Sequence, residues 1–205
     1  MTEILALDPA RTDNAKLMAD CDTLGYLGGT VADVTYGKGR FWKIIPAPAF
    51  MCFDIDPATF CSTADFRDLP LTSGTIDTVV FDPPYKLNGT STGKGPSALD
   101  VGYGVGDGYR SVAEIHTMIQ DGIDEAWRVL AVGGFLLLKC QPQQNAGRMN
   151  DQPGMFATHA VDSGRWVDVD RLHVITKPRK QPRKQRTARS NISTLVVLRK
   201  KRGSA

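Results

Sequence analysis

The sequence predicts an α/β domain built on a mostly parallel β-sheet. Segments with strand character and segments of helical periodicity are interspersed along the 205 residues, which is typical of parallel sheets with crossover helices. The segment Phe135–Cys140 is almost continuously apolar, as expected of a strand covered on both faces. The last two strand-like segments follow one another without a helix between them, which predicts an antiparallel pair at one end of the sheet.

The first part of the chain supplies one helix and four strands. Residues 12–27 have the amphipathic pattern of a short N-terminal helix within residues 1–30, with a cap at Thr12 or Asp13 and an end at Gly28-Gly29. Four short segments follow and are predicted as strands: Thr30–Thr35, Phe50–Asp54, Ser62–Phe66 and Ile76–Phe81. Two prolines end the fourth strand, because proline fixes φ and cannot donate a backbone hydrogen bond.

The second part of the chain begins after a glycine-rich loop, residues 86–110. Residues 112–130 carry apolar side chains at helical spacing, and Gly133-Gly134 is predicted to end this helix. The remaining predicted elements are a strand at Phe135–Cys140, a helix at Asp151–Asp162, and strands at Trp166–Thr176 and Ile192–Lys200.

The composition indicates an ordinary globular protein, with 41% apolar and 23% charged residues. No apolar run reaches the roughly 18 residues of a membrane span, and the first residues lack the pattern of a signal peptide. Cys52, Cys61 and Cys140 lie in or beside apolar runs, which favours buried, reduced thiols and a cytoplasmic protein. The three histidines are scattered, so we expect no metal site.

The charge of the chain is unevenly distributed. Eleven of the 25 basic residues lie in residues 177–202, which contain no acidic residue. The rest of the chain therefore carries 14 basic residues against 22 acidic ones. An acidic body with a basic tract predicts a polyanionic partner, and nucleic acid is the partner that we expect. A merely solubilising surface is the alternative interpretation of this tract.

The ends of the first two predicted strands have the pattern of a ligand site. The first strand runs into Asp33-Val-Thr-Tyr-Gly37-Lys-Gly39, and a G-x-G turn after a parallel strand lets the backbone approach a ligand closely. The second strand ends at Asp54, 17 residues beyond Gly37, where an acid commonly accepts hydrogen bonds from ribose hydroxyls. A strand-end cap is the alternative role. Trp42 stands where dinucleotide folds carry a third glycine, which argues against NAD.

The fourth predicted strand ends in Asp82-Pro83-Pro84-Tyr85, the most informative stretch of the sequence. The two prolines end the strand abruptly and leave carbonyl groups projecting where parallel strands bind ligands. The acid before them and the aromatic ring after them place a hydrogen-bond acceptor, a rigid carbonyl and a stacking face in one small space. A proline turn without a functional role is the alternative.

The motif series DVTYGKG, FDID, ADFRDLP and FDPPY resembles that of class I S-adenosylmethionine-dependent amino-methyltransferases of the DPPY type. The DPPY spelling is most similar to the adenine N6 DNA methyltransferases, and the resemblance covers roughly residues 31–140. It implies a single methyltransferase domain over residues 1–205, with S-adenosyl-L-methionine as cofactor. The implied fold is Rossmann-like, with a mostly parallel seven-stranded sheet whose last strand is antiparallel.

The resemblance also implies roles for individual residues. Those implied to bind the cofactor are Asp33, Gly37 and Gly39 for its methionine part, Thr35 and Tyr36 in the same turn, Asp54 for the ribose and Asp65 for the adenine amino group. Those implied to act on the target base are Asp82, Pro83, Pro84 and Tyr85.

The predicted activity is methyl transfer to the exocyclic amino group of a nucleic-acid base, with adenine N6 in DNA as the first choice. An RNA amino-methyltransferase acting on adenine N6 or guanine N2, and a non-catalytic nucleic-acid-binding module on the same fold, are the alternatives. We expect no separate recognition domain in a chain of this length, so the basic arm at residues 177–191 is predicted to hold the phosphate backbone. Its basic residues are Lys177, Arg179, Lys180, Arg183, Lys184, Arg186 and Arg189.

Overall fold

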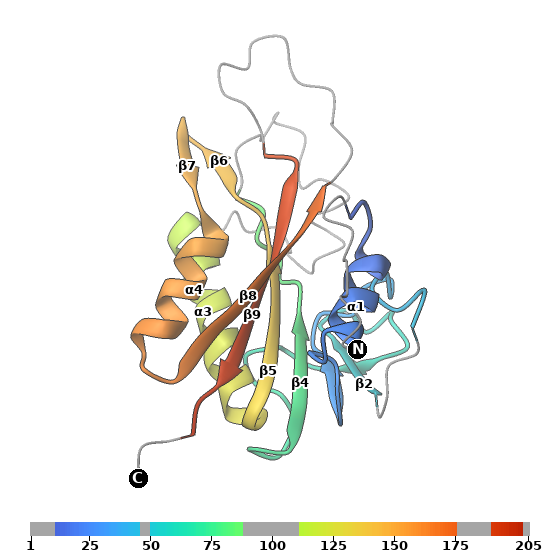
Figure 1. Ribbon diagram of the computed structural model, residues 1–205. Coiled ribbons are helices and arrows are strands. Elements are labelled where there is room, and N and C mark those ends of the chain that lie inside the picture. The colour runs from blue at the N-terminus through green and yellow to red at the C-terminus, as the bar shows by residue number, and fades with distance from the viewer. Residues whose placement is uncertain (1–10, 46–49, 88–110, 176–189, 203–205) are drawn as a thin grey trace, which may run out of the picture.

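A seven-stranded β-sheet forms the centre of the molecule (Figure 1). The computed structural model describes residues 11–45, 50–87, 111–175 and 190–202. In these residues the elements follow one another as α1 (Asn14–Thr23), β1 (Val31–Asp33), β2 (Phe50–Asp54), β3 (Ser62–Thr63), β4 (Ile76–Phe81), α3 (Val112–Val129), β5 (Leu130–Cys140), β6 (Gln143–Asn145), β7 (Arg148–Asn150), α4 (Gln152–Asp162), β8 (Trp166–Ile175) and β9 (Ile192–Lys200). The predicted bounds of β2, β4 and β9 are those observed.

The strands lie in the order β3-β2-β1-β4-β5-β9-β8. β1 pairs in parallel with β2 and β4, and parallel pairing extends to β3 on one side and β5 on the other. β9 is antiparallel to both of its neighbours, β5 and β8. The predicted mostly parallel sheet with an antiparallel last strand is therefore confirmed, as is the antiparallel pair at one end.

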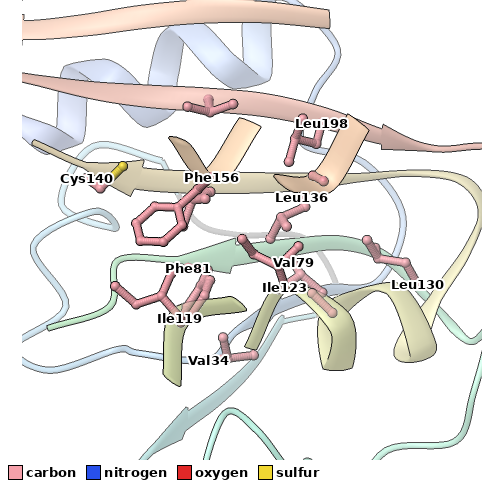
Figure 2. Close-up of a cluster of buried hydrophobic side chains, with 14 of the residues drawn as sticks. Val34, Val79, Phe81, Ile119, Ile123, Leu130, Leu136, Cys140, Phe156 and Leu198 are labelled. Atoms are coloured by element: carbon pink, nitrogen blue, oxygen red, sulfur yellow. The ribbon is translucent and has the colours of Figure 1, made fainter. Parts of the chain in front are cut away.

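Two apolar layers cover the central strands, because successive side chains of a strand point to opposite faces. Val79 and Phe81 of β4 pack with α3 and α4 on one face, while Val80 packs with α1 on the other. Figure 2 shows the first layer, in which Ile119 of α3 and Phe156 of α4 lie against the sheet. The near-continuous apolar character of the central strands follows from this double covering.

The first helix ends earlier than its glycines predicted. α1 begins after Asp13, whose carboxylate accepts a hydrogen bond from the Lys16 amide at 2.9 Å, and the helix ends at Thr23. Gly25, with a φ of 76°, turns the chain there. The predicted end at Gly28-Gly29 is therefore wrong, because an earlier glycine adopts the left-handed conformation that favours a helix end.

The second predicted helix, α3, also ends before its glycine pair. α3 stops at Val129 and β5 starts at Leu130, so Gly133-Gly134 lies inside a strand. Lys200 of β9 explains this end, because its Nζ donates to the carbonyl oxygens of Trp127 and Leu130 at 2.7 Å each. These bonds satisfy carbonyl groups that a helix leaves unpaired at its end.

The sequence did not predict the short hairpin formed by β6 and β7. The two strands pair in antiparallel fashion from Gln143 opposite Asn150 to Asn145 opposite Arg148. Ala146 and Gly147 connect them with φ values of 48° and 77°, which is the left-handed pair of a tight hairpin turn. Ala146 is an uncommon residue at such a position, and this is why the turn left no clear sequence signal.

A disulfide links Cys52 to Cys61, so the prediction that both are reduced thiols is wrong. β2 and β3 are neighbours in the sheet, and this pairing brings the two Cα atoms to 5.1 Å. That separation is within the range that a disulfide spans. Cys21 and Cys140 are buried free thiols, and burial raises the pKa of both.

Two segments that figure in the sequence predictions lie mostly outside the described residues. They are the glycine-rich loop, of which residues 88–110 are not described, and the basic arm, of which residues 177–189 are not described. Among the helices that the structure does describe, none is both long enough and apolar enough to cross a membrane.

Gly122 on α3 provides a test of the packing between this helix and the sheet. A Cβ atom added there would lie 2.6 Å from the Phe81 ring and 2.8 Å from the Phe66 ring. We expect Gly122→Ala to lower the free energy of unfolding by about 1–3 kcal/mol through overpacking, although alanine favours a helix by about 1 kcal/mol. Denaturant unfolding measures this change.

The control is Asp121→Ala on the exposed side of the same helix, which also raises helix propensity but meets no packed ring. A Gly122→Ala protein as stable as the Asp121→Ala protein would contradict the close approach of α3 to β4.

Candidate functional site

Three aspartates lie at the carboxyl ends of adjacent parallel strands. Asp33 ends β1, Asp54 ends β2, and Asp82 directly follows β4. β1 lies between β2 and β4, at the point where the order of the strands along the chain reverses. Open α/β sheets bind their ligands at such a switch point, beyond the carboxyl ends of the strands.

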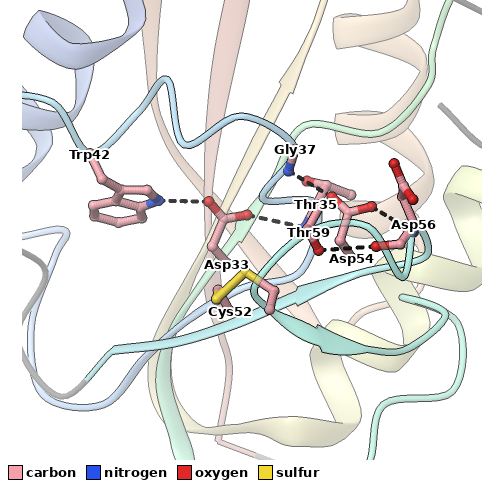
Figure 3. The surroundings of a disulfide bond; sticks show 9 residues. Asp33, Thr35, Gly37, Trp42, Cys52, Asp54, Asp56 and Thr59 are labelled. Carbon is pink, nitrogen blue, oxygen red and sulfur yellow. Dashed lines mark hydrogen bonds between the residues drawn. A yellow bond between two sulfur atoms is a disulfide. The ribbon is translucent and has the colours of Figure 1, made fainter. Parts of the chain in front are cut away.

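Asp33 is fully buried at the base of the turn that follows β1. Its carboxylate accepts hydrogen bonds from Trp42 Nε1 at 2.7 Å and from the Thr35 amide at 3.1 Å (Figure 3). Burial raises the pKa of Asp33 to about 7, while these two hydrogen bonds act to lower it. In this structure Asp33 therefore holds together the turn that carries the glycine motif.

The glycine turn is tied to β2 by Asp54. Gly37 donates its amide hydrogen to Asp54 Oδ2 at 2.6 Å, and Asp56 donates to Asp54 Oδ1 at 2.9 Å (Figure 3). Gly37 and Gly39 have φ values of 53° and 61°, a conformation that costs glycine little. The predicted glycine motif and the predicted ribose acid are therefore in direct contact.

The two remaining cofactor candidates lie on either side of Asp54 in the sequence. The Tyr36 ring contacts Phe60 with centroids 4.9 Å apart and Phe50 with centroids 5.8 Å apart. Asp65 follows β3, and its carboxylate forms an ion pair with Arg67 at 2.5 Å. The structure thus gives the Tyr36 ring aromatic neighbours and gives Asp65 a charged neighbour.

Asp82 is held from both neighbouring strands. Its amide donates to Thr35 Oγ1 at 2.7 Å, which joins the end of β4 to the turn after β1. Its carboxylate oxygens accept from Lys139 Nζ at 3.2 and 3.3 Å. Because Phe81 pairs with Leu138 in the β4–β5 register, Asp82 and Lys139 lie next to each other.

Lys139 occupies a largely apolar position. The residue is 5% exposed, and its Nζ lies 5.8 Å from the centre of the Phe41 ring and 5.9 Å from that of Tyr85. Burial raises the pKa of Asp82, whereas the charge of Lys139 and its hydrogen bonds act in the opposite direction. The ammonium group therefore favours the ionised form of a carboxyl group that its surroundings disfavour.

The prolines hold Tyr85 close to Asp82. The Tyr85 amide donates to the Pro83 carbonyl at 2.8 Å, across Pro84. The Tyr85 carbonyl accepts from Gln152 Nε2 at 2.9 Å, and Gln152 is fully buried at the start of α4. A carbonyl oxygen has two lone pairs, so Pro83 keeps acceptor capacity beyond its bond to Tyr85.

Sequence reasoning missed two residues of this site, Lys139 and Gln152. Lys139 is the single charge in the apolar run FLLLKC, and a lone charge at the end of a buried strand was the available signal. Gln152 left no such signal, because its contact with Tyr85 spans 67 residues. Within the described residues, no group of His, Cys, Asp and Glu is arranged to hold a metal ion.

No protein-family model matches the sequence, and no curated protein matches it either. Among solved structures, the N-methyltransferase NodS from Bradyrhizobium japonicum WM9 has a similar fold, with a TM-score of 0.54, 13% identity, and coverage of 91% of this chain and 93% of that chain. The same protein in complex with S-adenosyl-l-homocysteine matches at a TM-score of 0.52 and 14% identity over 90% of this chain and 86% of that chain. The protein Thermoplasma acidophilum 1320 matches at a TM-score of 0.52 and 17% identity over 91% of this chain and 88% of that chain. These similarities, together with the strand order of the sheet, show that the chain has the Rossmann-like fold of class I methyltransferases.

The raised pKa of Asp33 has a consequence for stability. An unfolded aspartate has a pKa of about 3.9, so the folded protein binds the Asp33 proton more tightly. The stabilisation from this proton is present below about pH 4 and is lost as the pH rises to about 7. We expect Asp33→Asn to gain stability relative to the parent over this range, by up to about 1.4 kcal/mol per pH unit. Denaturant unfolding at several pH values measures the difference.

Asp22→Asn, at an exposed position on α1, is the matched control for loss of one carboxylate. A stability difference between Asp33→Asn and the parent that stays constant from pH 4 to pH 7 would show that Asp33 does not hold its proton more tightly in the folded state.

Proposed function

We propose that the protein is an S-adenosylmethionine-dependent methyltransferase that acts on the exocyclic amino group of a nucleic-acid base, with adenine N6 in DNA as the substrate of first choice. One observation carries the proposal. On a class I methyltransferase fold, the Asp82–Tyr85 motif lies at the end of β4 and is bonded through Thr35 to the glycine turn after β1. A methyl donor at the turn and an amine at the motif would then be neighbours.

The residues of the β1 turn fit the proposed cofactor. A Cβ atom added at Gly37 would meet no heavy atom closer than 4.0 Å, so the backbone is open to a ligand on that side. Asp54 supplies carboxylate oxygens beside it, which are suitable acceptors for ribose hydroxyls. When bound, S-adenosylmethionine supplies a methyl group that is already activated by its sulfonium centre.

The chemistry left to the protein is positioning and electrostatic stabilisation. The lone pair of an adenine amino group is delocalised into the ring. The Asp82 carboxylate and the Pro83 carbonyl can each accept one amino hydrogen, which draws the nitrogen toward tetrahedral geometry. The negative charge of Asp82 also stabilises the positive charge that develops on the nitrogen, and the Tyr85 ring offers the base a stacking face.

The target base must leave a duplex to reach such a site. The amino group of a paired adenine is engaged in the base pair, so the base has to be flipped out or already unpaired. We infer that the basic arm, residues 177–191, holds the phosphate backbone while this happens. The arm connects β8 to β9 in the sequence, and it contains seven basic residues and no acidic residue. Phosphate contacts position a nucleic acid without reading its sequence.

The assay that tests the proposal measures transfer from labelled S-adenosylmethionine to DNA and to RNA, followed by mass spectrometry of the nucleosides. We expect N6-methyl-2′-deoxyadenosine among the nucleosides released from DNA. We also expect Asp82→Ala to bind the cofactor normally but to transfer about 100- to 1000-fold more slowly, as when another positioned polar group is removed from an active site. Asp124→Ala, an exposed position on α3, is the control.

Methylation of RNA alone would move the function to the RNA alternative. Absence of transfer to either nucleic acid, with cofactor binding intact, would overturn the proposal. Transfer at the parental rate by Asp82→Ala at saturating cofactor would remove Asp82 from the catalytic role.

Lys139 should determine the pH at which Asp82 works. Removing its charge in Lys139→Met leaves burial of Asp82 unopposed, so the pKa of Asp82 rises further above its ordinary value. Because the carboxylate form is the active one, we expect the acidic limb of the rate profile to move to higher pH. Lys139→Arg should restore much of the parental profile, and a reduced rate with an unmoved acidic limb would contradict this role.

A further inference from the structure

The β6–β7 hairpin stands at the same edge of the sheet as the proposed site. Figure 1 shows it beyond the carboxyl ends of β4 and β5. Its base is held on both sides by side chains that flank it in the sequence. Before the hairpin, Gln141 Nε2 donates to the carbonyl of Ser190, near the C-terminal end of the basic arm. After it, Gln152 donates to the Tyr85 carbonyl. The hairpin is therefore anchored between the proposed target motif and the residue where the basic arm rejoins the sheet.

The side chains of the hairpin differ from those of the rest of the protein. Outside residues 177–202 the chain carries an excess of acidic residues, yet residues 141–150 contain no acidic residue at all. They contain amide side chains and the guanidinium of Arg148. The tip, residues 146–149, is exposed, and Met149 is 51% exposed. A ribbon with partly exposed amide side chains and an exposed positive charge at its tip is suited to a polar, negatively charged surface.

The shape of the hairpin narrows the choice of partner. Its two three-residue strands and its two-residue turn make a slender ribbon. A two-stranded ribbon fits the major groove of B-form DNA, where amide and guanidinium groups form paired hydrogen bonds with base edges. The major groove of A-form RNA is too narrow to admit side chains in this way.

We propose that the β6–β7 hairpin inserts into the major groove of duplex DNA beside the target base and selects the sequence that is methylated. This inference rests on the proposed function and deepens it, because it assigns the reading of sequence to a hairpin within the fold. Arg148 and Asn145, which pair across the strands next to the turn, are the residues best placed to contact base edges. The basic arm would hold the phosphate backbone of the DNA, and the hairpin would determine which base sequence is preferred.

The test compares the full-length parent with Asn145→Ala/Arg148→Ala. Binding is measured on a randomised duplex DNA library with S-adenosylhomocysteine present, and methyl transfer is measured on the same library. For the double variant we expect at least about ten-fold weaker binding to the preferred sequences and loss of the preference, since paired hydrogen bonds to base edges distinguish one base from another. Cofactor affinity and thermal stability should match those of the parent.

Two further variants separate base reading from charge. Arg202→Ala removes an exposed positive charge beyond the opposite end of β9 (Figure 1) and should leave the preference unchanged. Arg148→Lys keeps the charge but loses the paired donors of arginine, so it should bind DNA with a relaxed preference. If the double variant keeps both the affinity and the preference of the parent, the inference is overturned.

The binding measurement does not depend on catalysis, so the hairpin inference and the proposed function are tested separately. Hairpin-dependent DNA binding without methyl transfer would support the hairpin and overturn the proposed function. Methylation of DNA with an unchanged preference in the double variant would support the function and overturn the hairpin. Failure of the parent to bind duplex DNA, including the case in which it binds RNA alone, would overturn the inference.

Discussion

The partly buried ion pair between Asp82 and Lys139 is the interaction on which the rest of the site depends. A carboxylate in a mostly buried position loses hydration worth several kcal/mol, and only a close partner compensates for this loss. The β4–β5 register supplies that partner, since it places a lysine beside the residue that ends β4. Thr35, in the turn that follows β1, fixes the same residue through its hydroxyl group. Three neighbouring strands therefore determine where one carboxylate lies, and the two prolines after it determine where Tyr85 lies.

Much of the fold could be predicted from the sequence, because its signals are local. The apolar runs of β2, β4 and β9 are bounded by polar residues or prolines, and their predicted ends were confirmed. The errors arose where distant residues decide the outcome. Lys200 ends α3 from a strand 70 residues away, so Gly133-Gly134 could enter β5. The Cys52–Cys61 disulfide depends on the pairing of β2 with β3. Neither effect is visible in the residues immediately around the position.

The candidate site shows the same difference between features set by local sequence and features set by distant residues. The acids at the ends of β1, β2 and β4 were found from sequence because each directly follows an apolar run, and parallel topology then brings them together. Gly37 and Thr35, which bond to Asp54 and Asp82, belong to the predicted motif. The residues that reach the site from later elements were not found: Lys139 bonds to Asp82 from β5, and Gln152 bonds to Tyr85 from α4. Sequence patterns thus identified the residues that could carry the chemistry. The residues that hold them in place were determined by packing across elements.

The position of β9 has a consequence for the order in which the protein can form. β9 is the last of the seven strands along the chain, yet it lies between β5 and β8, with Cys140 opposite Thr194 and Trp166 opposite Lys200. Until β9 has left the ribosome, β8 has no neighbour in the sheet and the apolar edge of β5 is unpaired. Contacts of such long sequence separation form slowly, and unpaired apolar edges invite association with other chains. A nascent chain that lacks β9 therefore exposes the unpaired apolar edge of β5, and interruption of synthesis before this strand would leave an aggregation-prone intermediate rather than a smaller folded protein.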